Sequence, residues 1–239
     1  EISLGLVGSE MCIRDRLSMT AAAKNKLITS TYCISKQPTK IVIGLHGWTG
    51  NEHMFEPVAK MIKVHDAKWV FPRAPYAADT GKGYTWFSGN DEKGWEIEKT
   101  WQGIDQLLND IQSEGFSLKN IYLIGFSQGA SLSMEIALRL PYSIGGIIPI
   151  AGFIKFMDIL GKEATEESKE TPILLLHGNQ DQIIPVSASQ KAYKFLQNRI
   201  LRGLRQYLPR NWVRVAGERE LSLIHISEPT RPRLISYAV

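Results

Sequence analysis

The residues Gly125-Phe126-Ser127-Gln128-Gly129 constrain the possible fold of this chain more than any other feature. A β-prone run, NIYLI at 120–124, leads into them, and a helical pattern at 127–140 follows. G-x-S-x-G between a strand and a helix predicts a sharp turn that strains the serine backbone and points its Oγ out of a sheet. The flanking glycines are expected because a Cβ at either position would collide with neighbouring elements. The alternative interpretation is a loop serine beside two packing glycines.

Short β-prone runs alternate with helical patterns through the middle of the chain. Strands are predicted at 40–45, 68–71, 120–124, 146–150 and 173–176, and helices at 54–63, 96–114, 127–140 and 187–198. In the clearest helix the apolar residues recur at spacings of three and four, which places them on one face; they are Ile97, Trp101, Ile104, Leu108 and Ile111. This alternation predicts an α/β domain with a mostly parallel, doubly wound sheet.

The first long strand is followed by the turn His46-Gly47-Trp48. A His-Gly turn in this position, together with the residue after a nucleophilic serine, is where an oxyanion hole forms in folds of this kind. We therefore predict that the backbone N–H groups of Trp48 and Gln128 are the two oxyanion donors. His46 itself is expected to fix the loop and not to act as a base.

The run ILLL at 173–176 leads into His177-Gly178-Asn179-Gln180-Asp181. An aspartate just past the carboxyl end of a strand lies where doubly wound sheets build active sites. Asp181 is therefore the candidate acid that accepts the Nδ1–H of a catalytic histidine and fixes its tautomer. The alternative interpretation is a solvated aspartate in a turn.

A long loop at 74–95 is rich in glycine and aromatic residues. Long loops inside compact domains are often functional, and ligand pockets are mostly apolar and aromatic. We predict that Tyr84, Trp86 and Phe87 line a pocket for the acyl or alcohol part of a substrate. Trp101 belongs to the helix face and is expected in the core.

Four segments together resemble the phospholipase/carboxylesterase family of α/β-hydrolases, which includes acyl-protein thioesterase-like enzymes. They are LHGWTGNE, PRAPY at 72–76, GFSQGASLSMEIALRLP and HGNQDQIIPV, and the resemblance covers about residues 39–198. It implies a Ser–His–Asp hydrolase that cleaves a small-molecule carboxylic ester or thioester through an acyl-enzyme, without a metal or organic cofactor. It assigns Ser127 as the nucleophile, Asp181 as the acid, and Trp48 and Gln128 as the oxyanion donors.

The histidine of this triad departs from the family pattern. In the family it lies in a Gly-His step well after the aspartate, beyond one more strand. Of the five histidines in this sequence only His225 follows Asp181, and it stands in SLIHIS without a preceding glycine. We therefore predict that the catalytic histidine, with a C-terminal strand and helix of the fold, is missing from this chain, and that the chain is inactive or impaired.

The basic charge is confined to one end of the chain. Residues 19–198 hold 16 Lys, 2 Arg and 18 acidic residues, whereas 199–239 hold 8 Arg, no Lys and 3 acidic residues. SLGLVGSEMCIRDR and LSLIHISEPTRPRLISYAV, at the two ends, resemble translated sequencing adapter. The expected organisation is an artefactual leader at 1–18, a C-terminally truncated α/β-hydrolase domain at 19–198, and an artefactual or frame-shifted tail at 199–239.

Composition excludes several other classes of protein. No apolar run approaches the roughly 20 residues of a membrane span, and acidic residues interrupt the leader, unlike a secretory signal. Cys33 is the single cysteine of 19–198, so no disulfide is expected there, which fits a cytoplasmic location. The Arg-rich tail leaves a nucleic-acid binder as an alternative, but it lacks lysine and any binding-module pattern, so no nucleic-acid partner is expected.

Two further functional alternatives share the predicted fold. One is a peptidase that uses the same triad. The other is a non-catalytic α/β-hydrolase domain that binds a small molecule or a partner. The intact GFSQG and HGNQD segments favour an enzyme over a binding domain, because binding alone has no need of a strained serine.

Overall fold

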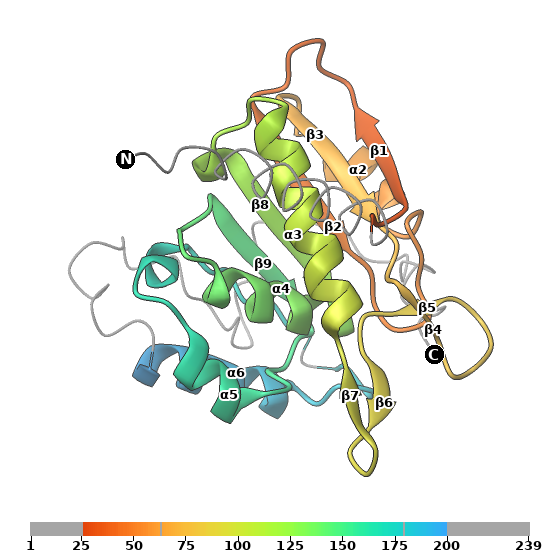
Figure 1. Ribbon diagram of the computed structural model, residues 1–239, viewed down its shortest axis with the longest axis vertical. Helices are drawn as coiled ribbons and strands as arrows, with labels where there is room; N and C mark the ends of the chain where they lie inside the picture. The colour runs from red at the N-terminus through yellow and green to blue at the C-terminus, as the bar shows by residue number, and fades with distance from the viewer. Residues whose placement is uncertain (1–25, 63, 179, 200–239) are drawn as a thin grey trace, which may run out of the picture.

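A five-stranded sheet forms the centre of the computed structural model, which describes residues 26–62, 64–178 and 180–199 (Figure 1). Its strand order is β1-β3-β2-β8-β9. Strands β3, β2, β8 and β9 run parallel, and β1 pairs antiparallel with β3. The bounds are Thr29–Cys33 for β1, Lys40–Leu45 for β2, Ala67–Pro72 for β3, Ile121–Phe126 for β8 and Gly146–Ile150 for β9. The predicted α/β fold with a mostly parallel sheet is confirmed.

A further extended segment lies beside β9. The N–H of Leu174 donates to the carbonyl of Ile147, and the N–H of Leu176 donates to that of Pro149, both at 2.9 Å. The pairing is parallel but consists of isolated bridges and not of a regular ladder. The predicted strand at 173–176 is thus a neighbour of β9 without being a regular strand.

Five α-helices and two short 3₁₀ turns are described. They are α2 Glu56–Ile62, α3 Glu98–Ser113, α4 Gln128–Arg139, α5 Met157–Glu163 and α6 Val186–Arg199, with η1 Leu118–Asn120 and η2 Glu167–Glu170. Ile104, Leu108 and Ile111 of α3 are buried, as their spacing predicts. Trp101 packs against the same core but is half-buried, with the Arg139 guanidinium 5.3 Å from its ring.

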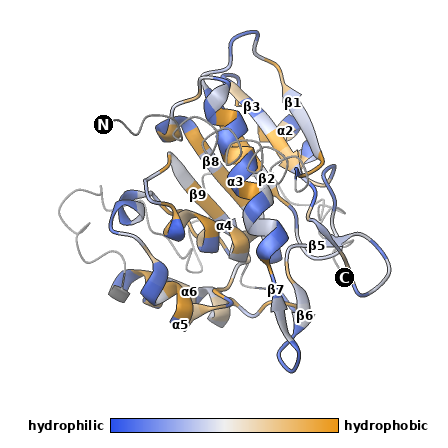
Figure 2. Cartoon of the chain, viewed as in Figure 1, coloured by the Kyte–Doolittle hydropathy of each residue, from blue (hydrophilic) through white to orange (hydrophobic). Residues whose placement is uncertain are grey.

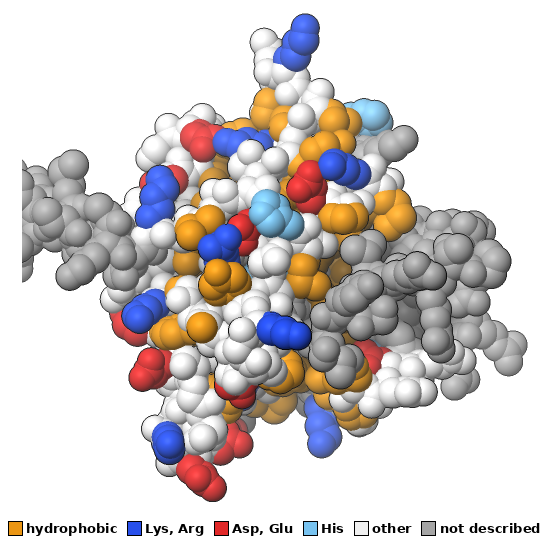
Figure 3. Space-filling view, turned by 90° about the vertical axis from the view of Figure 1, so that its right-hand side faces the viewer, with side chains coloured by type: hydrophobic (Ala, Val, Ile, Leu, Met, Phe, Trp, Pro, Cys, Tyr) orange, Lys and Arg blue, Asp and Glu red, His pale blue; other side chains and the backbone are white. Residues whose placement is uncertain are grey.

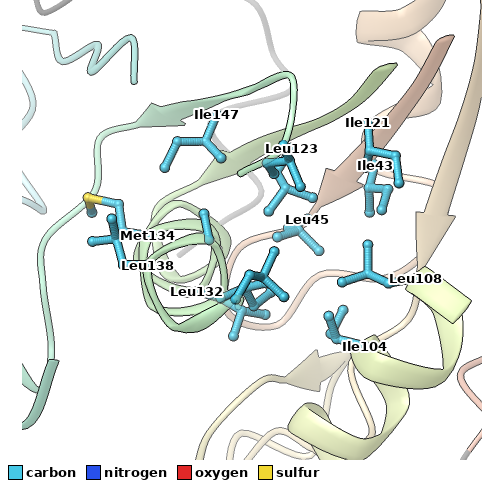
Figure 4. Close-up of a cluster of buried hydrophobic side chains, with 14 of the residues drawn as sticks. Ile43, Leu45, Ile104, Leu108, Ile121, Leu123, Leu132, Met134, Leu138 and Ile147 are labelled. Carbon is cyan, nitrogen blue, oxygen red and sulfur yellow. The ribbon is translucent and has the colours of Figure 1, made fainter. Parts of the chain in front are cut away.

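Both faces of the sheet are covered, which is typical of parallel sheets. On the face of α3 and α4, the side chains of Ile43 and Leu45 pack against those helices (Figure 4). On the other face, Val42 packs with Phe55 and with Ala59 of α2. Figure 2 shows hydrophobic residues concentrated in the central strands. This alternation along β2 fixes the register of the strand, because a shift by one residue would exchange its two faces.

The loop predicted at 74–95 is not structureless. It contains two short hairpins, formed by β4 Tyr76–Ala77 with β5 Tyr84–Thr85 and by β6 Ser88–Asn90 with β7 Gly94–Glu96. The second hairpin projects from the lower edge of the molecule in Figure 1. Two- and three-residue strands of this kind leave few apolar positions from which a sequence pattern could be recognised.

The strand order places one edge of the sheet at the expected ligand site. Strand β2 lies between β3 and β8. The chain passes from β2 to β3 on one side of β2, and β8 is later added on the other side. Open α/β sheets bind ligands at the carboxyl ends of the strands at such a reversal point. The turns at this edge are those that follow β2 and β8, which begin at His46 and Ser127.

On the face shown in Figure 3, acidic, basic and hydrophobic side chains are interspersed, and no large patch of one charge is visible.

Within the described residues, no helix combines the length and the apolar character needed to cross a bilayer.

Candidate active site

Ser127 occupies the turn between β8 and α4 with backbone angles of φ 52° and ψ −113°. Such a conformation costs a non-glycine residue about 1–3 kcal/mol and persists only where surrounding contacts enforce it. Here the N–H of Ser127 donates to the carbonyl of Ile150 at 2.9 Å, and its own carbonyl accepts the N–H of Ser131 at 3.0 Å. The predicted strained serine at a helix N-terminus is therefore present.

Both glycines that flank this turn are required by close backbone contacts. A Cβ on Gly125 would lie 2.2 Å from the carbonyl oxygen of Gly129. A Cβ on Gly129 would lie 2.0 Å from the carbonyl oxygen of Leu45. Neither position can hold a side chain without moving the backbone, which confirms the reason given for the two glycines.

The turn after β2 lies directly beside Ser127. A Cβ on Gly47 would be 3.7 Å from the Cβ of Ser127 and 3.4 Å from the Phe126 ring. Among the described residues, no acceptor receives the backbone N–H of Trp48 or of Gln128. Unengaged N–H groups next to a nucleophile are what an oxyanion hole requires. The assignment of these two donors stays a prediction that this arrangement favours.

His46 is a buried structural histidine. Its side chain is 1% exposed, its Nδ1 donates to the carbonyl of Gly47 at 2.7 Å, and its Nε2 accepts the N–H of Ala74 at 3.0 Å. Burial lowers the pKa of His46 to about 4. The imidazole is therefore neutral at pH 7 with both nitrogens occupied, so it cannot take a proton from the serine.

The Gln128 side chain joins the serine turn to the aromatic loop. Its Oε1 accepts the N–H of Trp86 at 2.9 Å, and its Nε2 donates to Oγ1 of Thr85 at 2.8 Å. The indole Nε1 of Trp86 donates to the carbonyl of His46 at 2.8 Å. Thr100 of α3 donates its hydroxyl to the Trp86 carbonyl at 2.7 Å. Trp86 thus links the serine turn, the His46 turn and α3.

The three aromatic residues predicted to line a pocket have different positions. Trp86 is 0% exposed and Phe87 is 3% exposed, and both belong to the hydrophobic core. The structure gives both side chains a packing role in the core, and their part in a substrate pocket stays a prediction. Tyr84 is half-buried, with the guanidinium of Arg73 4.7 Å from its ring. The role of Tyr84 in substrate binding stays a prediction.

A buried ion pair, which we did not predict, fixes the turn after β2 against the end of β3. Glu52 is 5% exposed, and both of its carboxylate oxygens accept hydrogen bonds from the guanidinium of Arg73. These bonds lower the pKa of Glu52 to about 2. Arg73 also donates to the Tyr84 hydroxyl at 3.2 Å. Glu52 lies in the segment LHGWTGNE, and Arg73 lies in PRAPY. Both segments were singled out in the sequence, but nothing in the sequence showed that these two residues pair.

Asp181 lies in a turn that its own carboxylate stabilises. Oδ1 accepts the N–H groups of Ile183 at 2.9 Å and Ile184 at 3.0 Å. Oδ2 lies 3.8 Å from Nε2 of His177, which is beyond hydrogen-bonding distance. The turn follows the segment beside β9, and β9 alone separates that segment from β8. Because the strands run parallel, the Asp181 turn and the Ser127 turn follow strand ends at the same edge of the sheet.

The structure does not supply the bridging histidine from the residues that it describes. The four described histidines are His46, His53, His65 and His177, and none forms a hydrogen bond with Ser127. His225 lies outside the described residues. No group of three or more histidine, cysteine, aspartate or glutamate residues in the described ranges could hold a metal ion.

A family model described as Phospholipase/Carboxylesterase matches residues 28–211. The chain belongs to the phospholipase/carboxylesterase family. The match extends beyond residue 198, where the sequence predicts the end of the domain, and that boundary stays a prediction. Membership in this family makes the serine turn, the His-Gly turn and the Asp181 turn parts of an α/β-hydrolase.

Several curated members of the family are similar to the chain. A probable carboxylesterase SOBER1-like protein of Arabidopsis thaliana is 27% identical, over 76% of this chain and 72% of its own length. An acyl-protein thioesterase 1 of Kluyveromyces lactis is 31% identical, over 67% of this chain and 78% of its own length. A probable inactive carboxylesterase of Oryza sativa is 28% identical, over 66% of this chain and 71% of its own length.

Solved structures of an esterase and of SOBER1 are similar to the structure of this chain. Esterase PE8 superposes with a TM-score of 0.62 at 27% identity, covering 72% of this chain and 84% of its own. SOBER1 of Arabidopsis thaliana superposes with a TM-score of 0.59 at 27% identity, covering 66% of this chain and 82% of its own. The α/β-hydrolase fold expected from the sequence is thus shared with enzymes of known structure.

Proposed function

We propose that this protein is a serine hydrolase that cleaves carboxylic esters or thioesters through a covalent acyl-enzyme. The observation that carries the proposal is the strained backbone of Ser127, held at φ 52° directly beside the His-Gly turn. A domain that only binds a ligand gains nothing from such strain. Family membership supports the same conclusion, because the relatives named above include a probable carboxylesterase and an acyl-protein thioesterase.

The proposed reaction assigns one role to each predicted residue. Oγ of Ser127 attacks the carbonyl carbon while a histidine imidazole takes its proton. The carbonyl oxygen becomes an oxyanion that accepts the N–H groups of Trp48 and Gln128. The alcohol or thiol leaves with the proton from the imidazolium, and water then repeats the attack on the acyl-enzyme. Oδ2 of Asp181 accepts the Nδ1–H of the histidine and stabilises the imidazolium.

We further propose that this chain lacks the histidine base and is impaired as an enzyme. The described histidines leave Ser127 without a base, and His225 has neither the Gly-His step nor a preceding strand pattern. A serine hydroxyl is a weak nucleophile until a base removes its proton. Triad enzymes without a functional triad retain about 10³–10⁴-fold acceleration over water, from the oxyanion hole and from binding.

Labelling with a fluorophosphonate probe, alongside hydrolysis of p-nitrophenyl esters and matching thioesters, tests both proposals. The comparison uses the chain as printed and a chimera whose residues from 199 onward come from an active relative with the Gly-His step. We expect weak labelling in the first, strong labelling and turnover in the second, and loss of both in Ser127→Ala. Strong activity of the printed chain that His225→Ala abolishes would contradict the missing-histidine proposal.

A non-catalytic binding domain is the second candidate. The observation that favours it is the lack of a described histidine at Ser127, and one relative is itself named as a probable inactive carboxylesterase. The chimera separates the two functions. A folded chimera that neither labels nor turns over any ester would favour the binding domain.

A further inference from the structure

His177 is a buried imidazole at the base of the turn that carries Asp181. Its residue is 4% exposed, and it directly follows the segment that pairs with β9. Neither the reaction proposed above nor the family match gives this side chain a role. Both of its ring nitrogens nevertheless face polar partners at short distance.

One nitrogen holds the far side of the Asp181 turn. Nε2 of His177 lies 2.8 Å from the carbonyl oxygen of Ile184, and because a carbonyl only accepts, Nε2 carries the proton. The N–H of Ile184 in turn donates to Oδ1 of Asp181. The backbone of Ile184 is therefore held on its N–H by the aspartate and on its carbonyl by the histidine.

The other nitrogen ties the turn to the rest of the domain. Nδ1 of His177 lies 2.6 Å from Oγ of Ser189, and Oγ lies 2.6 Å from the carbonyl oxygen of Gly152. With the ring proton on Nε2, Nδ1 and the carbonyl are both acceptors, and they share the single hydroxyl proton of Ser189. Gly152 packs against α4, since a Cβ there would lie 2.8 Å from the Cβ of Ala130. Helix α4 begins at the residue after Ser127. The aspartate turn and the serine turn are thus fastened to the same helix.

We propose that His177 is a positioning residue, which holds the Asp181 turn in place through Ile184 and Ser189. The proposal rests on the proposed function in that Asp181 is taken as the triad acid. His177 does not act as the base, because its ring is buried and both nitrogens face protein oxygens. At 3.8 Å His177 makes no hydrogen bond with Oδ2 of Asp181, and among the described residues no other group donates to this oxygen, which leaves it to a catalytic histidine.

Two substitutions separate the two contacts. The side-chain amide nitrogen of glutamine lies near the position of Nε2, so His177→Gln can keep the bond to the Ile184 carbonyl. The amide of asparagine lies near Nδ1, so His177→Asn can keep only the contact with Ser189. In the full chain we expect amide hydrogen exchange at Ile183 and Ile184 to become about tenfold faster in His177→Asn, as befits the loss of one buried hydrogen bond, and to stay near the original rate in His177→Gln.

Controls make the result specific to the turn. Ser133→Ala removes another buried hydroxyl, which bonds within α4 to the carbonyl of Ala130 at 2.7 Å, and it should leave both amides unchanged. Ser189→Ala removes the contact that His177→Gln also loses, so it should leave both amides near the original rate. If His177→Asn does not fold, His177→Ala, which also loses the contact with the Ile184 carbonyl, takes its place and should accelerate the two amides. Equal acceleration in the Asn and Gln variants, or none in either, would overturn the proposal. Exchange is read without turnover, so it is independent of whether the protein proves to be a hydrolase.

Discussion

The indole Nε1 of Trp86 donates a 2.8 Å hydrogen bond to the backbone oxygen of His46. These residues are 40 positions apart in the chain. The bond fastens the aromatic loop to the turn that carries Trp48, and the backbone N–H of Trp86 fastens the same loop to Gln128. The two turns that carry the predicted oxyanion donors are therefore both tied to Trp86, the His46 turn through its side chain and the Ser127 turn through its backbone.

Trp86→Phe should lower the free energy of unfolding by about 2–4 kcal/mol, because it leaves a small cavity and an unpaired His46 carbonyl. Trp69→Phe is a matched control: Trp69 is also buried, but its Nε1 has no hydrogen-bond partner among the described residues. We expect the control to cost about 1–2 kcal/mol less, as measured by urea unfolding. Equal losses would show that the hydrogen bond contributes little.

Gly129→Ala should destabilise the protein by at least about 3 kcal/mol, because the new Cβ would lie 2.0 Å from the Leu45 carbonyl oxygen. Gly178→Ala is the comparison, since among the described residues nothing lies within 4 Å of a Cβ at that position. We expect Gly178→Ala to change the free energy of unfolding by less than about 1 kcal/mol. Thermal unfolding checks both variants, and a stable Gly129→Ala protein would mean that the serine turn can rearrange.

His46 should make stability depend on pH between about 6.5 and 4. In the unfolded chain its imidazole takes up a proton below its ordinary pKa of 6.5, whereas in the folded protein burial holds the pKa near 4. The unfolded state then binds more protons, so the free energy of unfolding falls by up to about 1.4 kcal/mol for each pH unit lowered through this window.

Comparison with His46→Gln isolates this contribution. The difference in free energy of unfolding between the original protein and the variant should shrink as the pH falls from 6.5 to 4, and be constant above pH 7. His65→Gln, at an exposed position, should keep the original pH dependence. A difference between the original protein and His46→Gln that does not change with pH would show that His46 titrates alike in the folded and unfolded states.

Asp181→Asn, in the chimera that carries the Gly-His step, should keep the fold but lower kcat by about 10⁴-fold, because the asparagine favours the wrong histidine tautomer. Asp158→Asn on the exposed side of α5 is the matched control and should leave kcat unchanged. Steady-state hydrolysis of a p-nitrophenyl ester gives both values. A loss below about tenfold in Asp181→Asn would assign the acid to another carboxylate.

The central strands could be predicted because each is a short run of mostly apolar residues, which the sequence of the strand alone reveals. The predicted 40–45 and 146–150 coincide with β2 and β9, which are continuous apolar runs bounded by breaks. Strand β1 was missed, since TSTYC is polar and half-exposed. It becomes a strand through its partner, with Thr29 opposite Pro72 and Cys33 opposite Lys68. The hydrogen-bonding partner that makes residues 29–33 a strand is β3, so the sequence of β1 alone does not predict it.

At the candidate site, too, features set by neighbouring residues could be predicted, and features set by distant contacts could not. The geometry of Ser127 and the need for Gly125 and Gly129 were predictable, because a local turn determines them. The burial of Trp86 and Phe87 was not, because Trp86 is satisfied by the distant residues His46 and Gln128. An aromatic side chain in a loop has the same composition whether it faces a ligand or the core, and only the fold distinguishes the two.

The backbone at Ser127 has an evolutionary consequence. Glycine adopts a positive φ at little cost, so a glycine at 127 would relieve the strain while removing the reactive hydroxyl. Selection for a durable fold and selection for turnover therefore oppose each other at this single position. A glycine at 127 is therefore a substitution that would relieve backbone strain in the fold while abolishing the reaction proposed for this chain.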